Sequence, residues 1–263
     1  MPHFESNGAT IHYRIEGDTG APLVLLSNSL ASNLSMWDLQ VPALLAAGFR
    51  VLRYDTRGHG ASSVPTGPYT VETLAADACG LLDHLGEARA HFCGLSLGGM
   101  TGQKFATLYP ERLFSLVLCA TAAYMGPPDL WAGRIKTVEE GGMQAVVDTT
   151  LSRWFTEANQ QRLKTEVASI RAGILATPTA GYVGCGAAVR DMDQRESIRA
   201  ISAPTLVMVG ALDPATTVDS ARLLNERING SEMVIIRDTQ HLFNVEEPRE
   251  FNAALVDFLV RHR

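Results

Sequence analysis

One serine of this 263-residue chain stands between glycines where a strand-like run meets a helix-like run. The segment Gly94-Leu95-Ser96-Leu97-Gly98-Gly99 follows residues 88–93, which are typical of a strand, and precedes residues 100–109, which are typical of a helix. Glycines two residues to each side permit a sharply bent backbone, because larger side chains would collide there. Such a turn exposes the Ser96 hydroxyl and directs the N–H of Leu97 toward the same point. The sequence therefore predicts a nucleophilic serine at the end of a strand.

Strand and helix patterns alternate over most of the chain. Buried strands are also expected at residues 22–27, 50–54, 113–120, 205–210 and 233–237. Helices are expected at residues 34–47, 69–85, 218–227 and 250–261, with Thr70 as the N-cap of the second. This alternation indicates βαβ units and a mainly parallel sheet covered on both faces. Two short runs, residues 4–7 and 11–16, predict an antiparallel start to a sheet of eight strands in all.

The alternation stops between residues 124 and 193. This stretch has helix-like patterns, including residues 138–148 and 159–172, and carries two of the three tryptophans, Trp131 and Trp154. An all-helical insertion after a sheet strand is typical of a lid over the strand ends. We therefore expect an α/β core formed by residues 1–123 and 194–263, with residues 124–193 as a helical cap.

A serine nucleophile needs a general base and an acid that orients it, and at this kind of turn they follow in the order Ser, Asp, His. Asp213 follows the strand at residues 205–210, and His241 follows the last strand. The carboxyl ends of parallel strands meet at one edge, where α/β sheets bind ligands. Ser96, Asp213 and His241 are thus the predicted triad. His59, which precedes the serine, is expected to make a structural hydrogen bond in its loop, and Asp238 is a fallback for Asp213.

A second N–H beside the Leu97 N–H is needed to stabilise an oxyanion, and it should come from the loop after residues 22–27. Ser29 and Leu30 occupy the right positions, and we favour Leu30. The alternative is an ordinary loop leading into a helix, with Asn33 as its N-cap.

Composition limits the partners. The formal charge of −6 argues against nucleic acid and anionic membrane as partners. The first residues lack the basic and apolar runs of a signal peptide, and no apolar run has the length of a membrane span, so we expect a cytoplasmic protein. Cys79, Cys93, Cys119 and Cys185 are widely spaced and are expected to be free buried thiols. No metal or cofactor is expected, and the oligomeric state stays open.

Over its whole length the chain resembles the α/β-hydrolases, and its details are similar to the 3-oxoadipate enol-lactonases of the β-ketoadipate pathway. The narrower resemblance rests on Ser27-Asn28-Ser29-Leu30, Leu34-Ser35-Met36-Trp37, Arg153-Trp154-Phe155 and Arg190-Asp191-Met192-Asp193. The broader one rests on the serine turn and on Arg53-Tyr54-Asp55-Thr56-Arg57-Gly58-His59-Gly60. Ala31 stands where that family is expected to have glycine.

The resemblance implies hydrolysis of an unsaturated five-membered lactone that carries an acetate side chain. The substrate is then a small anion, which needs a cation in an otherwise acidic protein. One of Arg134, Arg153 and Arg190 is expected to bind its carboxylate. The residues expected around the substrate are Ser29, Trp131, Arg134, Arg153, Trp154 and Arg190.

Other functions fit parts of the same pattern. A general carboxylesterase, a perhydrolase-like enzyme and a C–C bond hydrolase use a similar triad on the same fold. A ligand receptor that kept a hydrolase pocket is the non-enzymatic alternative. A halide-displacing enzyme is not expected, because such enzymes place aspartate where this chain has Ser96.

Overall fold

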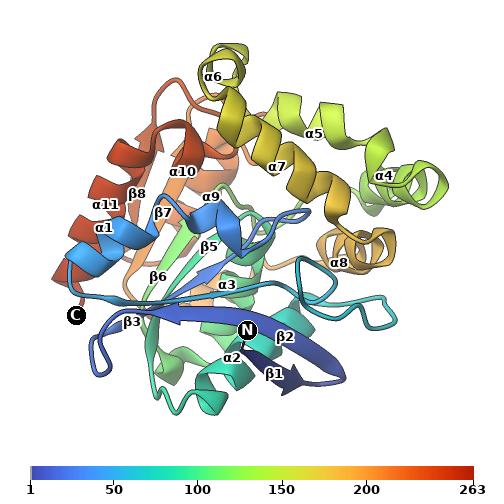
Figure 1. Cartoon of the computed structure of the whole chain (residues 1–263). Coiled ribbons are helices and arrows are strands. Elements are labelled where there is room, and N and C mark those ends of the chain that lie inside the picture. Colours follow the sequence, from blue (N-terminus) through green and yellow to red (C-terminus); the bar gives the residue numbers. More distant parts are fainter. Residues whose placement is uncertain (1) are drawn as a thin grey trace.

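A single eight-stranded sheet runs through the computed structural model, which describes residues 2–263 (Figure 1). The strands are β1 (His3–Ser6), β2 (Ala9–Glu16), β3 (Leu23–Ser27), β4 (Arg50–Tyr54), β5 (Ala90–Leu95), β6 (Leu113–Cys119), β7 (Thr205–Gly210) and β8 (Glu232–Ile236). Their order in the sheet is β1-β2-β4-β3-β5-β6-β7-β8. The pairs β1–β2 and β2–β4 are antiparallel and the other pairs are parallel. The expected mostly parallel sheet with an antiparallel start is confirmed.

Helices cover both faces of this sheet. They are α1 (Val41–Ala46), α2 (Val71–His84), α3 (Leu97–Leu108), α9 (Val218–Arg227), α10 (Phe243–Glu246) and α11 (Pro248–Arg261), with η1 (Leu34–Trp37) a short turn before α1. Val24 and Leu26 of β3 pack in one core with α1 and α11, while Leu23 and Leu25 pack in the other with α2, α3 and α9. This alternation follows from the two-residue period of a strand, and it makes both faces of β3 apolar.

Five helices lie between β6 and β7, in the region where the sequence predicts a helical cap (Figure 1). They are α4 (Pro128–Gly141), α5 (Val147–Trp154), α6 (Glu157–Arg162), α7 (Lys164–Ala176) and α8 (Thr179–Asp191). Tyr124 and Asp193 form an antiparallel bridge, so the two ends of the stretch meet. This bridge supports the expected division at residues 124 and 193, which stays a prediction. We call residues 124–193 the helical insertion.

Three expected helices are wrong in their extent. The one expected over residues 138–148 is broken because Gly142 takes a φ of 62°, which ends α4. The one expected over residues 159–172 is split at Leu163 into α6 and α7, and the one over residues 34–47 is split into η1 and α1. In each case the apolar periodicity alone does not mark where one helix ends and the next begins. The Thr70 cap is confirmed, since its side chain accepts from the Thr73 N–H.

Two further features concern the whole described chain. All four cysteines are free and buried, as expected. Among residues 2–263 no single helix is long and apolar enough to cross a membrane, and α7 and α8 reach that length and composition only as a pair bent by 93°.

Candidate active site

Ser96 lies between the end of β5 and the start of α3, with φ 57° and ψ −113°. Few residues other than glycine adopt such a backbone conformation, and it persists only where the surrounding structure enforces it. A Cβ on Gly94 would lie 2.1 Å from the Gly98 carbonyl oxygen, and one on Gly98 would lie 2.1 Å from that of Ser27. Both glycines are therefore required for the close approach of β5, α3 and β3 that shapes this turn.

Asp213 and His241 lie in the loops after β7 and β8, at the same sheet edge as Ser96. His241 Nδ1 lies 2.7 Å from Asp213 Oδ2. The other Asp213 oxygen accepts the N–H groups of Ala215 at 2.8 Å and Thr216 at 3.0 Å, and the Thr216 hydroxyl donates to Oδ2 at 2.7 Å. Because the carboxylate is surrounded by donors, His241 Nδ1 carries the proton of its bond to Asp213 and Nε2 stays free to accept one.

The charge state of Asp213 follows from these contacts. Burial alone would raise the pKa of Asp213, but the His241 charge and the hydrogen bonds from His241, Thr216 and the Ala215 N–H hold it below its ordinary value. Asp213 is therefore ionised at neutral pH and presents a carboxylate to His241 Nδ1.

Two backbone N–H groups near Ser96 make no hydrogen bond within residues 2–263. The Leu97 N–H is the first of α3, where no helical acceptor exists. In the loop after β3, the Ser29 N–H donates to Met36 Sδ at 3.3 Å and the Ala31 N–H donates to His59 Nε2 at 3.0 Å. The Leu30 N–H between them has no such partner. The loop geometry thus leaves the N–H groups of Leu97 and Leu30, the two expected to stabilise an oxyanion, without a partner in the described part of the chain.

His59 has a structural role in this arrangement. Its Nδ1 lies 3.3 Å from the Arg57 carbonyl, to which it donates, so that Nε2 accepts from Ala31. Burial lowers the pKa of His59 to about 4, which keeps the ring neutral and Nε2 an acceptor. Ala31 is held at φ 61°, the backbone conformation that favours the glycine expected there.

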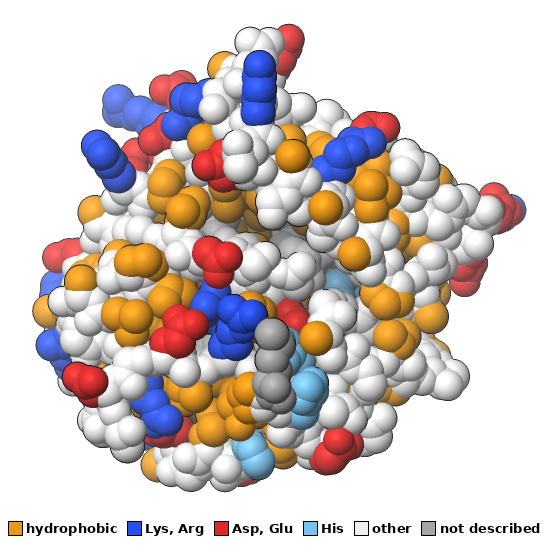
Figure 2. All heavy atoms as spheres, viewed as in Figure 1, with side chains coloured by type: hydrophobic (Ala, Val, Ile, Leu, Met, Phe, Trp, Pro, Cys, Tyr) orange, Lys and Arg blue, Asp and Glu red, His pale blue; other side chains and the backbone are white. Residues whose placement is uncertain are grey.

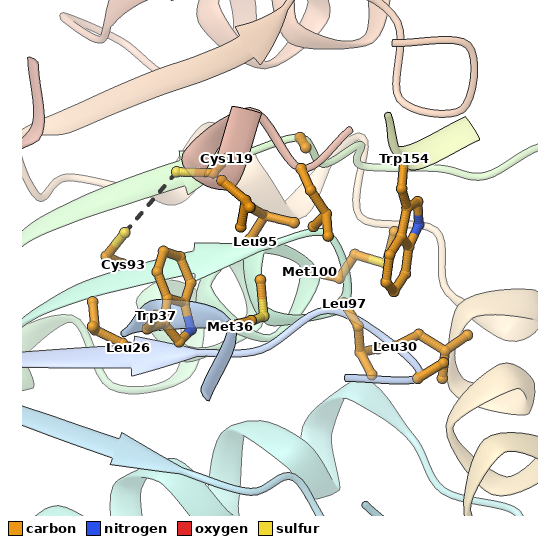
Figure 3. Close-up of a cluster of buried hydrophobic side chains, with 14 of the residues drawn as sticks. Leu26, Leu30, Met36, Trp37, Cys93, Leu95, Leu97, Met100, Cys119 and Trp154 are labelled. Carbon is orange, nitrogen blue, oxygen red and sulfur yellow. Dashed lines mark hydrogen bonds between the residues drawn. The ribbon is translucent and has the colours of Figure 1, made fainter. Parts of the chain in front are cut away.

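Ser96 and His241 line one cavity of about 530 Å³, together with Leu30 and Leu97. Figure 3 shows Leu30, Leu97, Met100 and Trp154 around this space. Within residues 2–263 the Ser96 hydroxyl and His241 Nε2 make no hydrogen bond to each other, and catalytic hydrogen bonds are commonly long until substrate binds. The Trp154 indole stacks on the His241 ring, with centroids 6.2 Å apart and planes at 24°.

The helical insertion contributes most of the remaining wall. The cavity is lined by five of the residues expected around the substrate: Trp131 and Arg134 of α4, Arg153 and Trp154 of α5, and Ser29 of the β3 loop. Arg190 is not among the lining residues, because its guanidinium pairs with Asp191 at 2.7 Å. Of the three arginines, the structure therefore brings two to the cavity.

Neither of these two arginines is neutralised by a carboxylate within residues 2–263. Arg134 donates to the Tyr182 hydroxyl at 2.5 Å and to Thr150 Oγ1 at 2.9 Å, and its guanidinium lies 6.0 Å from the Trp131 ring centroid. Arg153 is exposed and makes no ion pair. Among the described residues the lining contains no aspartate or glutamate. The cavity is therefore electropositive in a protein of net charge −6.

Comparison with known proteins places this geometry in a family. The family model for the alpha/beta hydrolase fold matches residues 22–248 of this chain. The chain belongs to the α/β-hydrolases. This α/β-hydrolase is 39% identical to 3-oxoadipate enol-lactonase 2 of Acinetobacter baylyi, over 93% of its own length and 91% of that relative. The resemblance to enol-lactonases is thus confirmed, and the chain is a hydrolase.

Solved structures agree with this assignment. The crystal structure of the enol-lactonase from Burkholderia xenovorans has a TM-score of 0.96 at 43% identity, covering 98% of this α/β-hydrolase and 100% of that chain. The malate-bound structure of a thermophilic esterase from Thermogutta terrifontis has a TM-score of 0.91 at 29% identity, covering 99% of this chain and 97% of that one.

Several residues of the site of this α/β-hydrolase were not predicted from sequence. Tyr182 of α8 holds Arg134, and Thr216 donates to Asp213. The position of Thr216 three residues after the predicted acid was an available signal, since such a hydroxyl reaches back in a turn. Tyr182 gave no signal, because its partner is 48 residues away in the chain.

Proposed function

We propose that this α/β-hydrolase converts 3-oxoadipate enol-lactone and water to 3-oxoadipate. The observation that carries the proposal is the electropositive cavity, which joins the serine turn and the free face of His241 to two arginines without carboxylate partners. Such a lining suits a small anionic ester. Two enol-lactonases among the relatives, at 39% and 34% identity, support the lactone as substrate.

Ser96, Asp213 and His241 act as the triad in this proposal. The Ser96 oxygen forms a bond to the lactone carbonyl carbon while its proton passes to His241 Nε2. Asp213 holds the ring in the required tautomer and stabilises the cation that forms. The N–H groups of Leu97 and Leu30 stabilise the oxyanion, where charge develops in the transition state.

The intermediate then collapses with cleavage of the lactone C–O bond. The leaving oxygen is an enol, a better leaving group than an alkoxide, and it takes the proton from His241. Tautomerisation to the ketone removes it as a nucleophile and prevents ring closure. Water next attacks the acyl-enzyme and gives a proton to His241, and Ser96 recovers that proton as the ester bond breaks.

Arg134 and Arg153 bind the carboxylate of the substrate in this proposal. Arg134 is oriented by Tyr182 and Thr150, whereas Arg153 lies free at the cavity wall. The helical insertion, as a cap over the strand ends, therefore supplies the charge that selects an anion. The paired Arg190 is not part of this contact.

The Ser96→Ala variant tests the proposal. Lactone turnover should fall by roughly three or more orders of magnitude, and mass spectrometry should no longer detect an acyl-enzyme. Ser152→Ala is the matched control, because Ser152 is an exposed serine of α5 that donates only to the Thr149 carbonyl. Turnover of the lactone by Ser96→Ala at the control rate would reject the triad assignment.

A second test concerns the charge of the cavity. Arg134→Met and Arg153→Met should each raise KM for the lactone by about 10- to 100-fold, because a charge-assisted hydrogen bond is lost. Neutral aryl esters should be nearly unaffected, and Arg190→Met is the matched control from the same insertion. Equal effects on lactone and neutral ester would show that neither arginine selects the anion.

The esterase similarity favours a second activity. A 29% identical esterase shares the fold over nearly the whole chain, so simple carboxylic esters are a competing substrate class. Comparison of kcat/KM for the freshly generated lactone and for phenyl acetate separates the two. A preference for phenyl acetate would replace the lactonase proposal by a general carboxylesterase.

A further inference from the structure

Glu246 is a buried acid that the proposed mechanism does not use. It ends the short helix α10, five residues after His241, and its exposed fraction is 0%. Its carboxylate has no cation partner within residues 2–263. Arg162 donates instead to the Glu246 backbone carbonyl and to Glu247. Burial of an unpaired carboxylate is costly, so its presence calls for a structural or functional reason.

Three donors converge on this carboxylate from two parts of the chain. The Gln240 N–H donates to Oε2 at 2.5 Å. The Thr156 N–H and the Asn159 side-chain amide both donate to Oε1 at 2.9 Å. Thr156 and Asn159 belong to the helical insertion, whereas Gln240 immediately precedes His241. Glu246 therefore joins the insertion to the loop that carries the histidine.

The residue on the other side of His241 is tied to the insertion as well. The Leu242 N–H donates to the Trp154 carbonyl at 3.1 Å, and the Trp154 indole stacks on the His241 ring. The two peptide N–H groups that flank His241 thus have their acceptors outside the β8 loop itself. These two hydrogen bonds, one on each side of His241, explain how a loop residue keeps its ring aligned with Asp213.

We propose that Glu246 is a positioning residue, which fixes His241 for catalysis by holding the Gln240 N–H against the helical insertion. The inference rests on the proposed role of His241 as the base. The insertion then does more than line the cavity, because it sets the orientation of a triad member through Glu246 and Trp154. Burial raises the pKa of Glu246 while its three donors lower it, and the net value lies above the ordinary one.

The variant Glu246→Gln separates the contact of Glu246 with the Gln240 N–H from its contacts with Thr156 and Asn159. Two donors face Oε1 and one faces Oε2, so the glutamine oxygen is expected to take the Oε1 place. Its NH₂ group then meets the Gln240 N–H, donor against donor, and the His241 loop shifts while the contacts with Thr156 and Asn159 persist. We expect kcat to fall by about 10- to 100-fold for both lactone and neutral aryl ester, with KM little changed.

A substrate-independent readout is the proton NMR signal of the His241 Nδ1–H bond to Asp213. It should shift or broaden in Glu246→Gln and remain in place in the matched control Glu247→Gln, because the Glu247 carboxylate accepts only from Arg162 within residues 2–263. Thermal unfolding is measured for both variants, because a purely structural role of Glu246 would lower the melting temperature of Glu246→Gln without moving the NMR signal. Wild-type kcat and an unchanged NMR signal in Glu246→Gln would overturn the proposal, whichever substrate proves to be natural.

Glu246→Asp covers the case in which the glutamine variant does not fold. It keeps the charge but withdraws the carboxylate by one methylene from the Gln240 N–H, so an intermediate loss of kcat and an intermediate NMR shift are expected. Full kcat in Glu246→Asp would show that this contact is not needed to hold His241.

Discussion

The orientation of the Asp213 carboxylate is decided by backbone N–H groups rather than by His241. Oδ1 accepts from Ala215 and Thr216 in a turn that the chain forms within three residues, which leaves Oδ2 for the imidazole. A local turn therefore sets the tautomer of a histidine 28 residues away. The Asp213 side chain and the N–H groups of Ala215 and Thr216 therefore orient His241 together. A substitution that keeps the shape of the Asp213 side chain but turns one acceptor into a donor should test this.

Asp213→Asn is expected to lower kcat by about 10⁴-fold. The asparagine oxygen stays on the two N–H groups, so its NH₂ group faces His241 Nδ1 and forces the ring proton onto Nε2, the atom that must accept from Ser96. Thr216→Val removes one donor from Oδ2 and should cost only about tenfold, as expected for one hydrogen bond. Steady-state kinetics of both variants test these expectations. A kcat of Asp213→Asn within tenfold of the wild-type value would contradict the role assigned to Asp213.

Among the elements, α5 contributes a residue to two hollows. A second cavity of about 250 Å³ lies between the η1 segment and α7 and is lined by Ile170, Gly173 and Leu242, among others. Trp154 lines both this cavity and the catalytic one. Figure 2 shows hydrophobic side chains on either side of the hollow below α7. We therefore expect the Trp154 indole of α5 to limit the length of acyl chain that an ester bound at Ser96 can place beyond the catalytic cavity.

Trp154→Ala should join the two cavities. Its overall kcat should fall because the His241 ring loses a stacking partner, but the ratio of octanoate to acetate turnover for aryl esters should rise at least about tenfold. Each newly buried methylene contributes about 0.8 kcal/mol, so two already suffice. Trp131→Ala is the matched control, since Trp131 lines only the catalytic cavity. An unchanged chain-length ratio, or an equal rise in the control, would show that Trp154 is not the partition.

The fold as a whole buries two histidines as neutral rings. The pKa of both His59 and His91 is lowered to about 4, mainly by burial, and for His91 the nearby charges of His262 and Arg263 contribute to that lowering. His91 Nδ1 lies 2.8 Å from Ser115 Oγ, between strands β5 and β6. Each folded-state pKa is below the ordinary 6.5, so the unfolded chain takes up these protons first. Their contribution to stability is complete above pH 6.5 and is lost as the pH falls toward 4.

His91→Gln should therefore flatten the acid side of the stability curve. Urea unfolding between pH 6 and 4.5 should give a dependence on pH that is smaller by about 1 kcal/mol per pH unit than in wild type. Glutamine still bonds to Ser115 but does not titrate in this range. His3→Gln, a change at an exposed histidine, should leave the slope unaltered. A variant as steep as wild type would mean that His91 takes up no proton on unfolding in this range.

The sequence was enough for those parts of the protein that local rules control. Glycines at 94 and 98 indicated the bent turn at Ser96, and the two-residue and 3.6-residue periods indicated which segments form strands and helices. Because parallel strands end at one edge, residues after three separate strands could be assigned to one site. Strand ends and chain order thus predicted that Ser96, Asp213 and His241 follow three strands of one sheet edge, while their joint action stays a prediction.

Folding brings together residues that are far apart in the chain, and no local pattern encodes those contacts. The division between α6 and α7 at Leu163 is not marked by the apolar period, so these helix bounds could not be predicted from it. Arg190 pairs with Asp191, the next residue in the chain, whereas Arg134 is held at the cavity by Tyr182, which is 48 residues away and is brought there only by folding. Glu246 stands as one acid among many until the fold surrounds it with three donors. Charge and nucleophilicity are properties of an environment, and the environment forms only when the chain closes on itself.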